Sequence, residues 1–549
     1  MSVMTYLPFG AGGVIIRVET DIRRGIPGVD ITGLAVGAVR EARDRVRAAF
    51  RNSGFKFPLD RILINLAPAG MKKDGAALDL PIALSVMSSA GIAPVCGDLL
   101  VMGELELSGR IRPVRGVLAA ISAGLAGGIT EFIVPLENAG EAAILLNKGI
   151  SFTAAGNLQE AVHALFIREE QGSLPTTLPE TLLAALPVTM PQAVLSANTG
   201  INSETTSTFS ETSGDFADVR GQAVYKRALE VTAAGGHNLL AFGPPGAGKT
   251  MLAKRLPSIM TPLTSDEAVE VTRLYSLAGP FSNNGNFIDR LITSAPFRAP
   301  HHSASAEGIL GGGRNPRPGE ITLAHFGVLC LDEAPEFRIN VLQALREPLE
   351  DKVISIARAE GVIRFPAEFQ LLMTANSCPC GRLGMREAEK GFSGESSRIC
   401  LCSPEEINRY WRKFGGALLD RVEIRTAVLP GEMRRSTGSG EEKSAEIAKR
   451  VRAAVEIQRQ RFKNTAIRRN ALIPAGKTDS FCPMNEKAEN AFHKAIEKLG
   501  LSGRAYHGVL RVARTIADLE GKDTIEIEHI LEAVQHRRLG EDPYEILSM

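Results

Sequence analysis

One glycine-rich stretch constrains the fold of this chain more than any other: Gly243-Pro244-Pro245-Gly246-Ala247-Gly248-Lys249-Thr250. The apolar residues 238–242 before it predict a short buried strand, and the apolar spacing after it predicts a helix that begins at Lys249. Glycines let backbone N–H groups approach a phosphate, and the helix N-terminus adds partial positive charge. Lys249 is expected to reach the β- and γ-phosphates of a nucleotide, and the Thr250 hydroxyl to bind Mg²⁺. A plain glycine-rich turn is the alternative, but all eight positions fit an ATP- or GTP-binding P-loop.

The bulk composition is that of a globular chain with several domains. Its 549 residues are 44% hydrophobic and 23% charged, with a net charge of +1, and this length predicts roughly two to four domains. The balanced charge gives no overall preference for nucleic acid, although a local basic surface stays open. No apolar run approaches the ~20 residues that cross a bilayer, and the N-terminus lacks the pattern of a signal peptide. Seven cysteines, four of them clustered, favour a reducing cytoplasm, so we expect a cytoplasmic protein without a membrane partner.

Residues 1–166 alternate short strand-like and helix-like runs. Residues 14–19 and 61–66 predict strands, and residues 40–50 and 80–90 predict helices. The region is therefore expected to be an α+β domain.

Two segments of this region, 68–79 and 103–116, resemble the proteolytic domain of Lon proteases. Where Lon proteases place a nucleophilic serine the chain has Ala77, and where they place a catalytic lysine it has Leu118. Alanine carries no attacking oxygen and leucine cannot take a proton, so a Ser-Lys dyad cannot form there. The resemblance implies a Lon-like domain used for interaction or assembly. The two departures, Ala77 and Leu118, disfavour an ATP-dependent protease.

The composition divides the rest of the chain. Residues 167–214 are rich in serine, threonine and proline and predict a flexible linker, in which the apolar residues 182–186 are either a docking segment or an ordinary linker patch. Residues 215–430 are expected to form the nucleotide-binding core, and residues 431–549 a helical domain.

Polar side chains follow two further predicted strands of the core. Asp332 and Glu333 end an apolar run, and the carboxyl end of a strand is where ligands sit in an open α/β sheet. Asp332 is expected to hold Mg²⁺ through its water shell, and Glu333 to polarise the attacking water. Asn376 follows the apolar strand 369–375, where it either orients that water or ends the strand in a turn.

These motifs in this order resemble AAA+ ATPases. The resemblance implies that Arg421, near the far edge of the core, is an arginine finger that reaches the γ-phosphate of a neighbouring subunit. A surface ion pair between Arg421 and Asp420 is the alternative.

The helical region contains a second candidate arginine. Ser502 is a predicted helix N-cap, and Arg504 lies in the first turn after it. In AAA+ lid domains a sensor-2 arginine at such a position reads the nucleotide phosphates, with Arg511 and Arg514 as alternatives on the same helix.

Two insertions into the core indicate which kind of AAA+ ATPase the chain resembles. A glycine- and arginine-rich loop covers residues 296–320, and residues 352–365 predict a β-hairpin. Both resemble insertions shared by the magnesium-chelatase ATPase subunit and MCM helicases, in which basic side chains line a central pore. The resemblance implies DNA contacts from these loops, against solvated residues or intersubunit ion pairs as the alternative. The candidates are Arg298, His301, His302, Arg314, Arg317 and Arg358.

Four cysteines cluster in a polar element at residues 376–403. Cys378 and Cys380 form one Cys-x-Cys pair, and Cys400 and Cys402 form a second. Four thiolates give a tetrahedral zinc site, which would fix a segment that has little means of folding alone. Reduced cysteines in a loop are the alternative.

The order of the whole chain resembles the ComM (YifB, magnesium chelatase-like) family of bacterial AAA+ ATPases. The resemblance implies an α/β fold in which a P-loop AAA+ ATPase module with a helical lid follows a Lon-like α+β domain. It also implies ATP and Mg²⁺ as cofactors and a hexameric DNA helicase that promotes branch migration in homologous recombination during natural transformation. The expected partners are single-stranded or branched DNA, further copies of the chain and recombination proteins. A chelatase- or chaperone-type remodeller of a protein partner is the alternative function.

Overall fold

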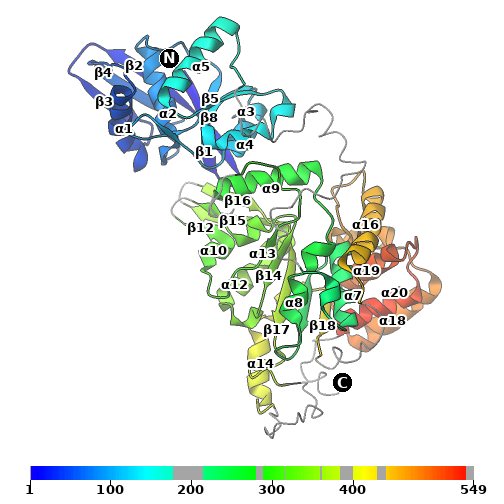
Figure 1. Ribbon diagram of the computed structural model, residues 1–549. Helices are drawn as coiled ribbons and strands as arrows, with labels where there is room; N and C mark the ends of the chain where they lie inside the picture. The colour runs from blue at the N-terminus through cyan, green and yellow to red at the C-terminus, as the bar shows by residue number, and fades with distance from the viewer. Residues whose placement is uncertain are drawn as a thin grey trace.

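The computed structural model describes residues 2–176, 214–279, 288–313, 316–358, 361–383, 400–429 and 441–538. They form an N-terminal α/β unit, a core around a parallel sheet, and a helical lid beside that core (Figure 1). Most of the predicted linker, including residues 182–186, lies outside the described residues, as does Arg314. None of the helices in these ranges is long and apolar enough to cross a membrane.

The N-terminal unit is built on a seven-stranded sheet in the order β3-β4-β2-β1-β5-β8-β9. Strands β1, β2 and β4 pair antiparallel, whereas β5, β8 and β9 pair parallel. The strands are β1 (Ser2–Phe9), β2 (Gly12–Arg23), β3 (Gly28–Thr32), β4 (Arg61–Ala67), β5 (Leu99–Val101), β8 (Glu131–Pro135) and β9 (Ser151–Ala155), with a small hairpin of β6 (Glu104–Leu105) and β7 (Ile111–Arg112). The helices are α1 (Ala38–Asn52), α2 (Asp79–Ser89), α3 (Val117–Ala126), α4 (Ala139–Ala143) and α5 (Leu158–Gln171).

The N-terminal unit extends beyond the predicted boundary at residue 166. Helix α5 continues to Gln171, Leu174 is buried in the apolar core of the unit, and the Thr153 hydroxyl donates to the carbonyl of Pro175. Serine, threonine and proline in this stretch suggested a linker, but one buried leucine is enough to hold the chain against the sheet.

Leu118 and Ala77, the two positions where a Ser-Lys dyad would be expected, pack in one apolar cluster. Leu118 is fully buried and Ala77 partly buried in it. Lys73, a nearby lysine, is also buried, and its amine donates to the carbonyls of Gly33 and Met71 at 2.9 and 2.8 Å. Because that amine is used by backbone oxygens, it cannot serve as a replacement base.

The same cluster contacts the core through helix α9 (Ser265–Ala278), which lies directly below the N-terminal unit in Figure 1. Leu277 of α9 packs beside Leu118, and the Gly116 N–H donates to the Ser276 carbonyl at 3.0 Å. Glu141 is buried here, where it accepts hydrogen bonds from the Leu118 N–H and the Ser276 hydroxyl. The surface that carries the dyad in Lon proteases is therefore part of a domain interface in this chain.

The core sheet has five parallel strands in the order β11-β14-β17-β10-β18. Strands β10 and β14 are continuous apolar runs, and β17 is apolar apart from Gln370 and Thr374, because helices cover both faces of a parallel sheet. The strands are β10 (Leu239–Phe242), β11 (Phe297–Arg298), β14 (Val328–Leu331), β17 (Gln370–Ala375) and β18 (Ile424–Ala427). The helices besides α9 are α7 (Ala223–Gly235), α8 (Lys249–Ala253), α10 (Ala306–Leu310), α11 (Glu320–Leu323), α12 (Ile339–Ala344), α13 (Arg346–Asp351), α14 (Pro404–Arg412) and α15 (Gly416–Leu419).

Two hairpins project from the core toward the N-terminal unit (Figure 1). One pairs β15 (Val353–Arg358) with β16 (Gly361–Pro366), the hairpin that the sequence predicted. The other pairs β12 (Gly311–Gly312) with β13 (Arg317–Pro318) inside the segment predicted as a loop. The N–H of Ala11, in the turn between β1 and β2, donates to the Arg364 carbonyl on β16 at 3.1 Å. The N-terminal unit thus contacts a hairpin that the sequence assigned to a pore.

The lid consists of α16 (Ser444–Arg461), α17 (Thr478–Phe481), α18 (Glu486–Leu499), α19 (Gly503–Leu519) and α20 (Ile527–Arg538). Its apolar faces share one cluster with α7 of the core, in which Val451 and Leu510 lie with Val231. The described residues of the predicted helical region are mainly helical, and the Ser502 hydroxyl caps α19, as predicted, by accepting the Ala505 N–H.

Candidate nucleotide site

The glycine-rich stretch connects β10 to α8 at the carboxyl edge of the core sheet. Gly248, which precedes α8, and Gly246 have φ angles of 89° and 77°, a region that glycine adopts without strain. Gly243 lies so close to β18 that a Cβ there would be 2.2 Å from the Val428 carbonyl oxygen. Larger residues at these positions would displace the backbone from the phosphate-binding conformation.

Lys249 is buried at the start of α8. Its amine donates to the carbonyls of Gly243 and Pro244, each at 2.8 Å, and to the Asn376 side-chain oxygen at 3.2 Å. Burial lowers the pKa of Lys249 to about 8, and the charges of Asp332 and Glu333 oppose that shift. A phosphate that entered the loop would offer this amine a charged acceptor in place of neutral carbonyls.

Lys249→Ala should weaken MgATP binding about 10- to 100-fold, because a charged hydrogen bond contributes about 1.5–3 kcal/mol. The advantage of the wild-type chain should shrink above pH 8, since its free amine loses a proton there whereas the bound phosphate favours the charged form. Titration of a fluorescent ATP analogue from pH 7 to 9 measures both effects. Lys249→Arg is the control that stays charged, and an undiminished affinity of Lys249→Ala at pH 7 would contradict the assignment.

Asp332 and Thr250 form a pair of oxygen ligands at the end of β14. The Asp332 carboxylate accepts the Thr250 hydroxyl at 2.8 Å and the Thr374 hydroxyl of β17 at 2.5 Å. A carboxylate that follows β14 and a hydroxyl from the first turn of α8 converge here and fit Mg²⁺, which takes few protein oxygens and keeps several waters. Such an ion would neutralise phosphate charge at the place where Lys249 also lies.

Glu333 is exposed beside this pair, and its backbone is in a left-handed conformation with φ of 52°. Its N–H donates to the Thr374 hydroxyl at 3.0 Å, which fixes the turn. Strained backbone of this kind costs about 1–3 kcal/mol and clusters at functional sites. The turn thus holds an exposed carboxylate residue at the end of the sheet that carries the P-loop.

Asn376 ends β17 next to the P-loop. Its side-chain oxygen accepts from Lys249, and its backbone N–H donates to the Tyr410 hydroxyl at 3.2 Å. The structure therefore brings Lys249, Thr250, Asp332, Glu333 and Asn376 to one edge of the sheet, through β10, β14 and β17.

Arg421 lies at the other end of the core strands, where their amino-terminal ends are. Its carbonyl accepts the side chain of Asn238, the residue directly before β10, whereas the P-loop directly follows β10. Its guanidinium pairs with Glu350 and donates to the Ala417 carbonyl at 2.6 Å. Asp420 pairs with Arg537 at 2.8 Å instead, so the structure does not contain the alternative ion pair between Asp420 and Arg421.

Arg504 lies beside Arg421 rather than beside the P-loop of its own chain. Its guanidinium pairs with Glu350 at 2.7 Å, so one carboxylate holds both arginines. A cavity of about 630 Å³ between the core and the lid is lined by Arg421, Arg504 and Arg511. The lid arginine and the core arginine thus share one face, which the linear sequence could not indicate.

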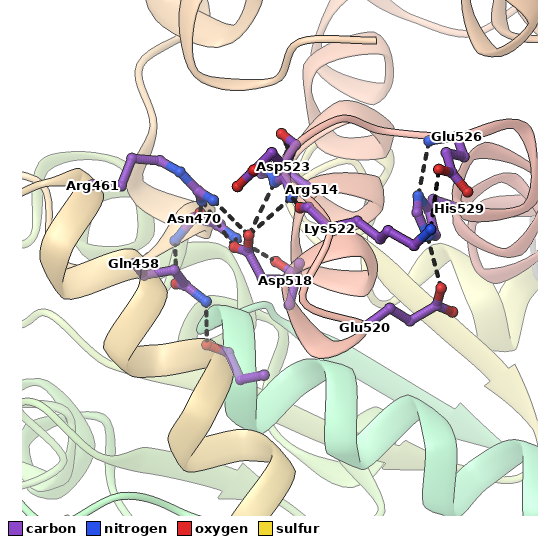
Figure 2. Close-up of polar contacts among 12 residues, drawn as sticks. Gln458, Arg461, Asn470, Arg514, Asp518, Glu520, Lys522, Asp523, Glu526 and His529 are labelled. Carbon is purple, nitrogen blue, oxygen red and sulfur yellow. Dashed lines mark hydrogen bonds and ion pairs between the residues drawn. The ribbon is translucent and has the colours of Figure 1, made fainter. Parts of the chain in front are cut away.

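Arg514, the other alternative on α19, is a structural residue. It is fully buried in the lid and pairs with Asp518 at 3.0 Å (Figure 2). Asp518 also accepts from Arg461 and from the Asn470 amide, the latter at 2.8 Å. A guanidinium enclosed by these partners cannot reach a nucleotide.

Asp518→Ala should destabilise the lid by about 3–5 kcal/mol, because it leaves the buried guanidinium of Arg514 and the partly buried one of Arg461 without their carboxylate. Hydrogen exchange of the α16 and α19 amides measures the opening free energy. Asp523→Ala is the matched control, since Asp523 is exposed and Arg514 contacts its carbonyl rather than its carboxylate. Equal protection in the two variants would show that the ion pairs in Figure 2 contribute little.

Arg298 does not belong with the exposed loop arginines, which corrects its prediction as a DNA contact. It lies on β11, and its guanidinium binds the Glu320 carboxylate through two hydrogen bonds of 2.6 and 2.8 Å. This bidentate pair, with only about a fifth of either side chain exposed, uses the groups that would bind phosphate. His301 is exposed, and its ring stacks on His302 with centroids 4.1 Å apart.

Arg317 and Arg358 are exposed on the two neighbouring hairpins. The Arg358 guanidinium donates to the Gly313 carbonyl at 2.8 Å, which ties β15–β16 to β12–β13. Sequence reasoning missed Arg364 on the same hairpin and Arg115 of the N-terminal unit, whose pKa is lowered by burial and by the charge of Arg317. Only the packing of α9 against the N-terminal unit brings Arg115 to this surface.

The four clustered cysteines converge in space. Their sulfur atoms all lie within 4.8 Å of one another, and Cys378 lies 3.3 Å from Cys380 and 3.6 Å from Cys400. Tetrahedral zinc with Zn–S bonds of ~2.3 Å would space its sulfurs by about 3.8 Å. The geometry and the soft thiolate donors fit a metal ion such as zinc.

Comparison with known proteins agrees with this architecture. Residues 215–435 match the family model "Magnesium chelatase, subunit ChlI", residues 18–138 match "Subunit ChlI of Mg-chelatase", and residues 441–537 match "Magnesium chelatase, subunit ChlI C-terminal". The chain is 38% identical over 535 residues to the competence protein ComM of Haemophilus influenzae, covering 96% of each protein. The chain belongs to the ComM/YifB magnesium chelatase-like family.

Other relatives support the two-part organisation. YifB of Salmonella typhimurium is 37% identical over 542 residues, which cover 98% of this chain and 97% of that protein. A Lon protease of Salinispora arenicola is 29% identical over 136 residues, or 24% of this chain and 18% of the protease. The predicted AAA+ module after a Lon-like domain is thus confirmed, and the family suggests ATPase activity.

Proposed function

We propose that the chain is an ATP-dependent DNA helicase or translocase that works as a homo-oligomeric ring, expected to be hexameric, in the cytoplasm. Its role would be to promote branch migration during homologous recombination in natural transformation. The competence protein of Haemophilus influenzae, which matches nearly the full length, supports this role. ATP and Mg²⁺ are the proposed cofactors.

The observation that carries the proposal is the position of Arg421 across the sheet from the P-loop. Strand β10 separates the two edges by about 13 Å, from four residues at ~3.3 Å each. An arginine at one edge and a phosphate loop at the other complete each other only between two subunits, and repetition of such a head-to-tail contact closes a ring. Arg504, beside Arg421 on Glu350, would act on the same neighbour.

The hairpins supply the proposed DNA surface. Arg317 and Arg358 are exposed on two hairpins that the hydrogen bond from Arg358 to the Gly313 carbonyl joins, and the charge of Arg317 acts on a further arginine, Arg115. Like charges held close together favour a polyanion such as the phosphate backbone, and the described residues place no carboxylate in an ion pair with Arg317 or Arg358. DNA binding would then couple to the core through the sheet that also carries the nucleotide residues.

An Arg317→Ala, Arg358→Ala double variant should keep its basal ATP turnover and lose stimulation by DNA. Its binding to a four-way junction should also lose about two units of salt dependence, since each phosphate contact contributes about one. Arg459→Ala, an exposed lid arginine, is the control. Unwinding of junction and linear substrates with ATP tests the motor directly, and a junction that ATP leaves unchanged would contradict the proposal.

A chelatase- or chaperone-type remodeller is the second candidate, because the magnesium-chelatase family models match the core and the lid. It predicts ATP turnover stimulated by a protein partner, with the double variant indistinguishable from wild type in DNA binding.

A further inference from the structure

The four-cysteine cluster lies against the nucleotide site. The Gly381 N–H donates to the Cys378 carbonyl at 3.0 Å, which closes a tight turn around the first cysteine pair. Gly381 has a φ of 76°, and a Cβ there would lie 2.9 Å from Pro245 Cδ in the P-loop and 3.9 Å from Asn376 Cγ. Only glycine fits at this contact, so the cysteine turn and the P-loop are in direct van der Waals contact.

The second cysteine pair leads into the helix that anchors Asn376. Ser403, directly after Cys402, is the N-cap of α14 in a capping box with Glu406. From α14 the Tyr410 hydroxyl accepts the Asn376 N–H at 3.2 Å, and Trp411 donates to the Ser377 carbonyl at 3.1 Å. Trp411 also packs edge-on against Phe242, the last residue of β10, with centroids 5.6 Å apart.

Asn376 is therefore held by two segments, each next to a cysteine pair: its own chain, which continues to Cys378, and helix α14, which follows Cys402. Cys378 follows it by two residues along the chain, and Cys402 begins the approach to its Tyr410 anchor. A metal bound to all four sulfurs would tie both segments together, and its binding energy would stabilise this local fold. In the metal-free state only weak thiol contacts would join the two pairs.

We propose that Cys378, Cys380, Cys400 and Cys402 bind one zinc ion that positions Asn376 at the nucleotide, so that metal occupancy controls the rate of ATP hydrolysis. The ion is a positioning group, because the turn that carries two of its ligands packs through Gly381 against Pro245, whereas the ligands themselves do not bind the nucleotide. Lys249 is linked to these segments by its hydrogen bond to Asn376, but its bonds to the Gly243 and Pro244 carbonyls and the bond between Thr250 and Asp332 do not involve them. Loss of zinc should thus slow turnover more than it weakens nucleotide binding. This inference rests on the proposed ATPase activity but not on DNA as the substrate.

Metal analysis of the full chain tests the site itself. Protein from zinc-supplemented cells should contain about one zinc per chain, and replacement by Co²⁺ should give the thiolate-to-metal absorption of a tetrahedral four-sulfur site. Cys402→Ser should lose the stoichiometric metal, whereas Cys482→Ala should keep it, since Cys482 is buried in the lid. Absence of bound zinc from the wild-type protein would overturn the proposal.

Chelation of the wild-type chain tests the coupling without any substitution. After zinc removal by 1,10-phenanthroline, with Mg²⁺ kept in excess, kcat for ATP without DNA should fall about a hundredfold, the effect of a ~1 Å misplacement. The Kd for a slowly hydrolysed ATP analogue should change less than about threefold, and added Zn²⁺ should restore kcat. Unchanged kcat in fully metal-free protein would overturn the positioning role. Because no DNA is present, failure of the motor proposal would leave this result unaffected.

Discussion

An Arg421→Ala chain is expected to bind MgATP normally and to lose ATP turnover by roughly 10³- to 10⁵-fold, the range for removal of an arginine finger. Binding should survive because Arg421 lies at the edge of the sheet opposite Lys249 and Thr250. Turnover should fail because γ-phosphate charge that develops in the transition state would lose its stabilising cation. Titration with an ATP analogue and steady-state phosphate release measure the two effects separately.

The shared site predicts how Arg421→Ala behaves in mixtures. When it is mixed with wild-type chains, the fractional loss of ATP turnover should exceed the fraction of variant chains, because each variant subunit disables the site of its neighbour. Arg459→Ala, which removes an exposed lid arginine, is the control. Its own ATP turnover should equal that of the wild type, and mixtures of the two chains should turn over ATP at the same rate. Turnover in strict proportion to the wild-type fraction would mean that each chain completes its own site.

Glu333→Gln should retain MgATP and slow its hydrolysis by roughly 10²- to 10⁴-fold, the usual contribution of a general base. The amide keeps the size of the side chain and the contact between the Glu333 N–H and Thr374, but it cannot accept a proton from water. Single-turnover hydrolysis with the chain in excess isolates this step from product release.

Glu336→Gln is the matched control for Glu333→Gln, because Glu336 is a second exposed carboxylate in the turn that follows. It should hydrolyse ATP like the wild type. A Glu333→Gln chain with a normal single-turnover rate would require another group to activate the water.

Local sequence patterns were sufficient to predict the strands and polar residues at the end of the core sheet that carries the P-loop. Strands buried on both faces are mainly apolar, so β10, β14 and β17 and the polar residues that follow them could be predicted from short apolar runs. The turn around Gly243 and Gly246 follows from the same local chemistry.

Contacts between residues that lie far apart in the chain could not be predicted from the sequence. Nothing local indicates that Glu350 holds both Arg421 and Arg504, or that Glu320 uses the guanidinium of Arg298. Helical periodicity placed Arg514 on α19, but its burial depends on Asp518 together with Arg461 of another helix. The interface between α9 and the N-terminal unit likewise depends on tertiary packing that no periodicity encodes.

The most direct test of a site shared between subunits is ATP turnover per chain across a dilution series, with the mass of the assembly measured in the same samples. Our account predicts that turnover per chain falls as the assembly dissociates and that the monomer binds ATP without hydrolysing it. A monomer that hydrolyses ATP at the full rate would contradict it.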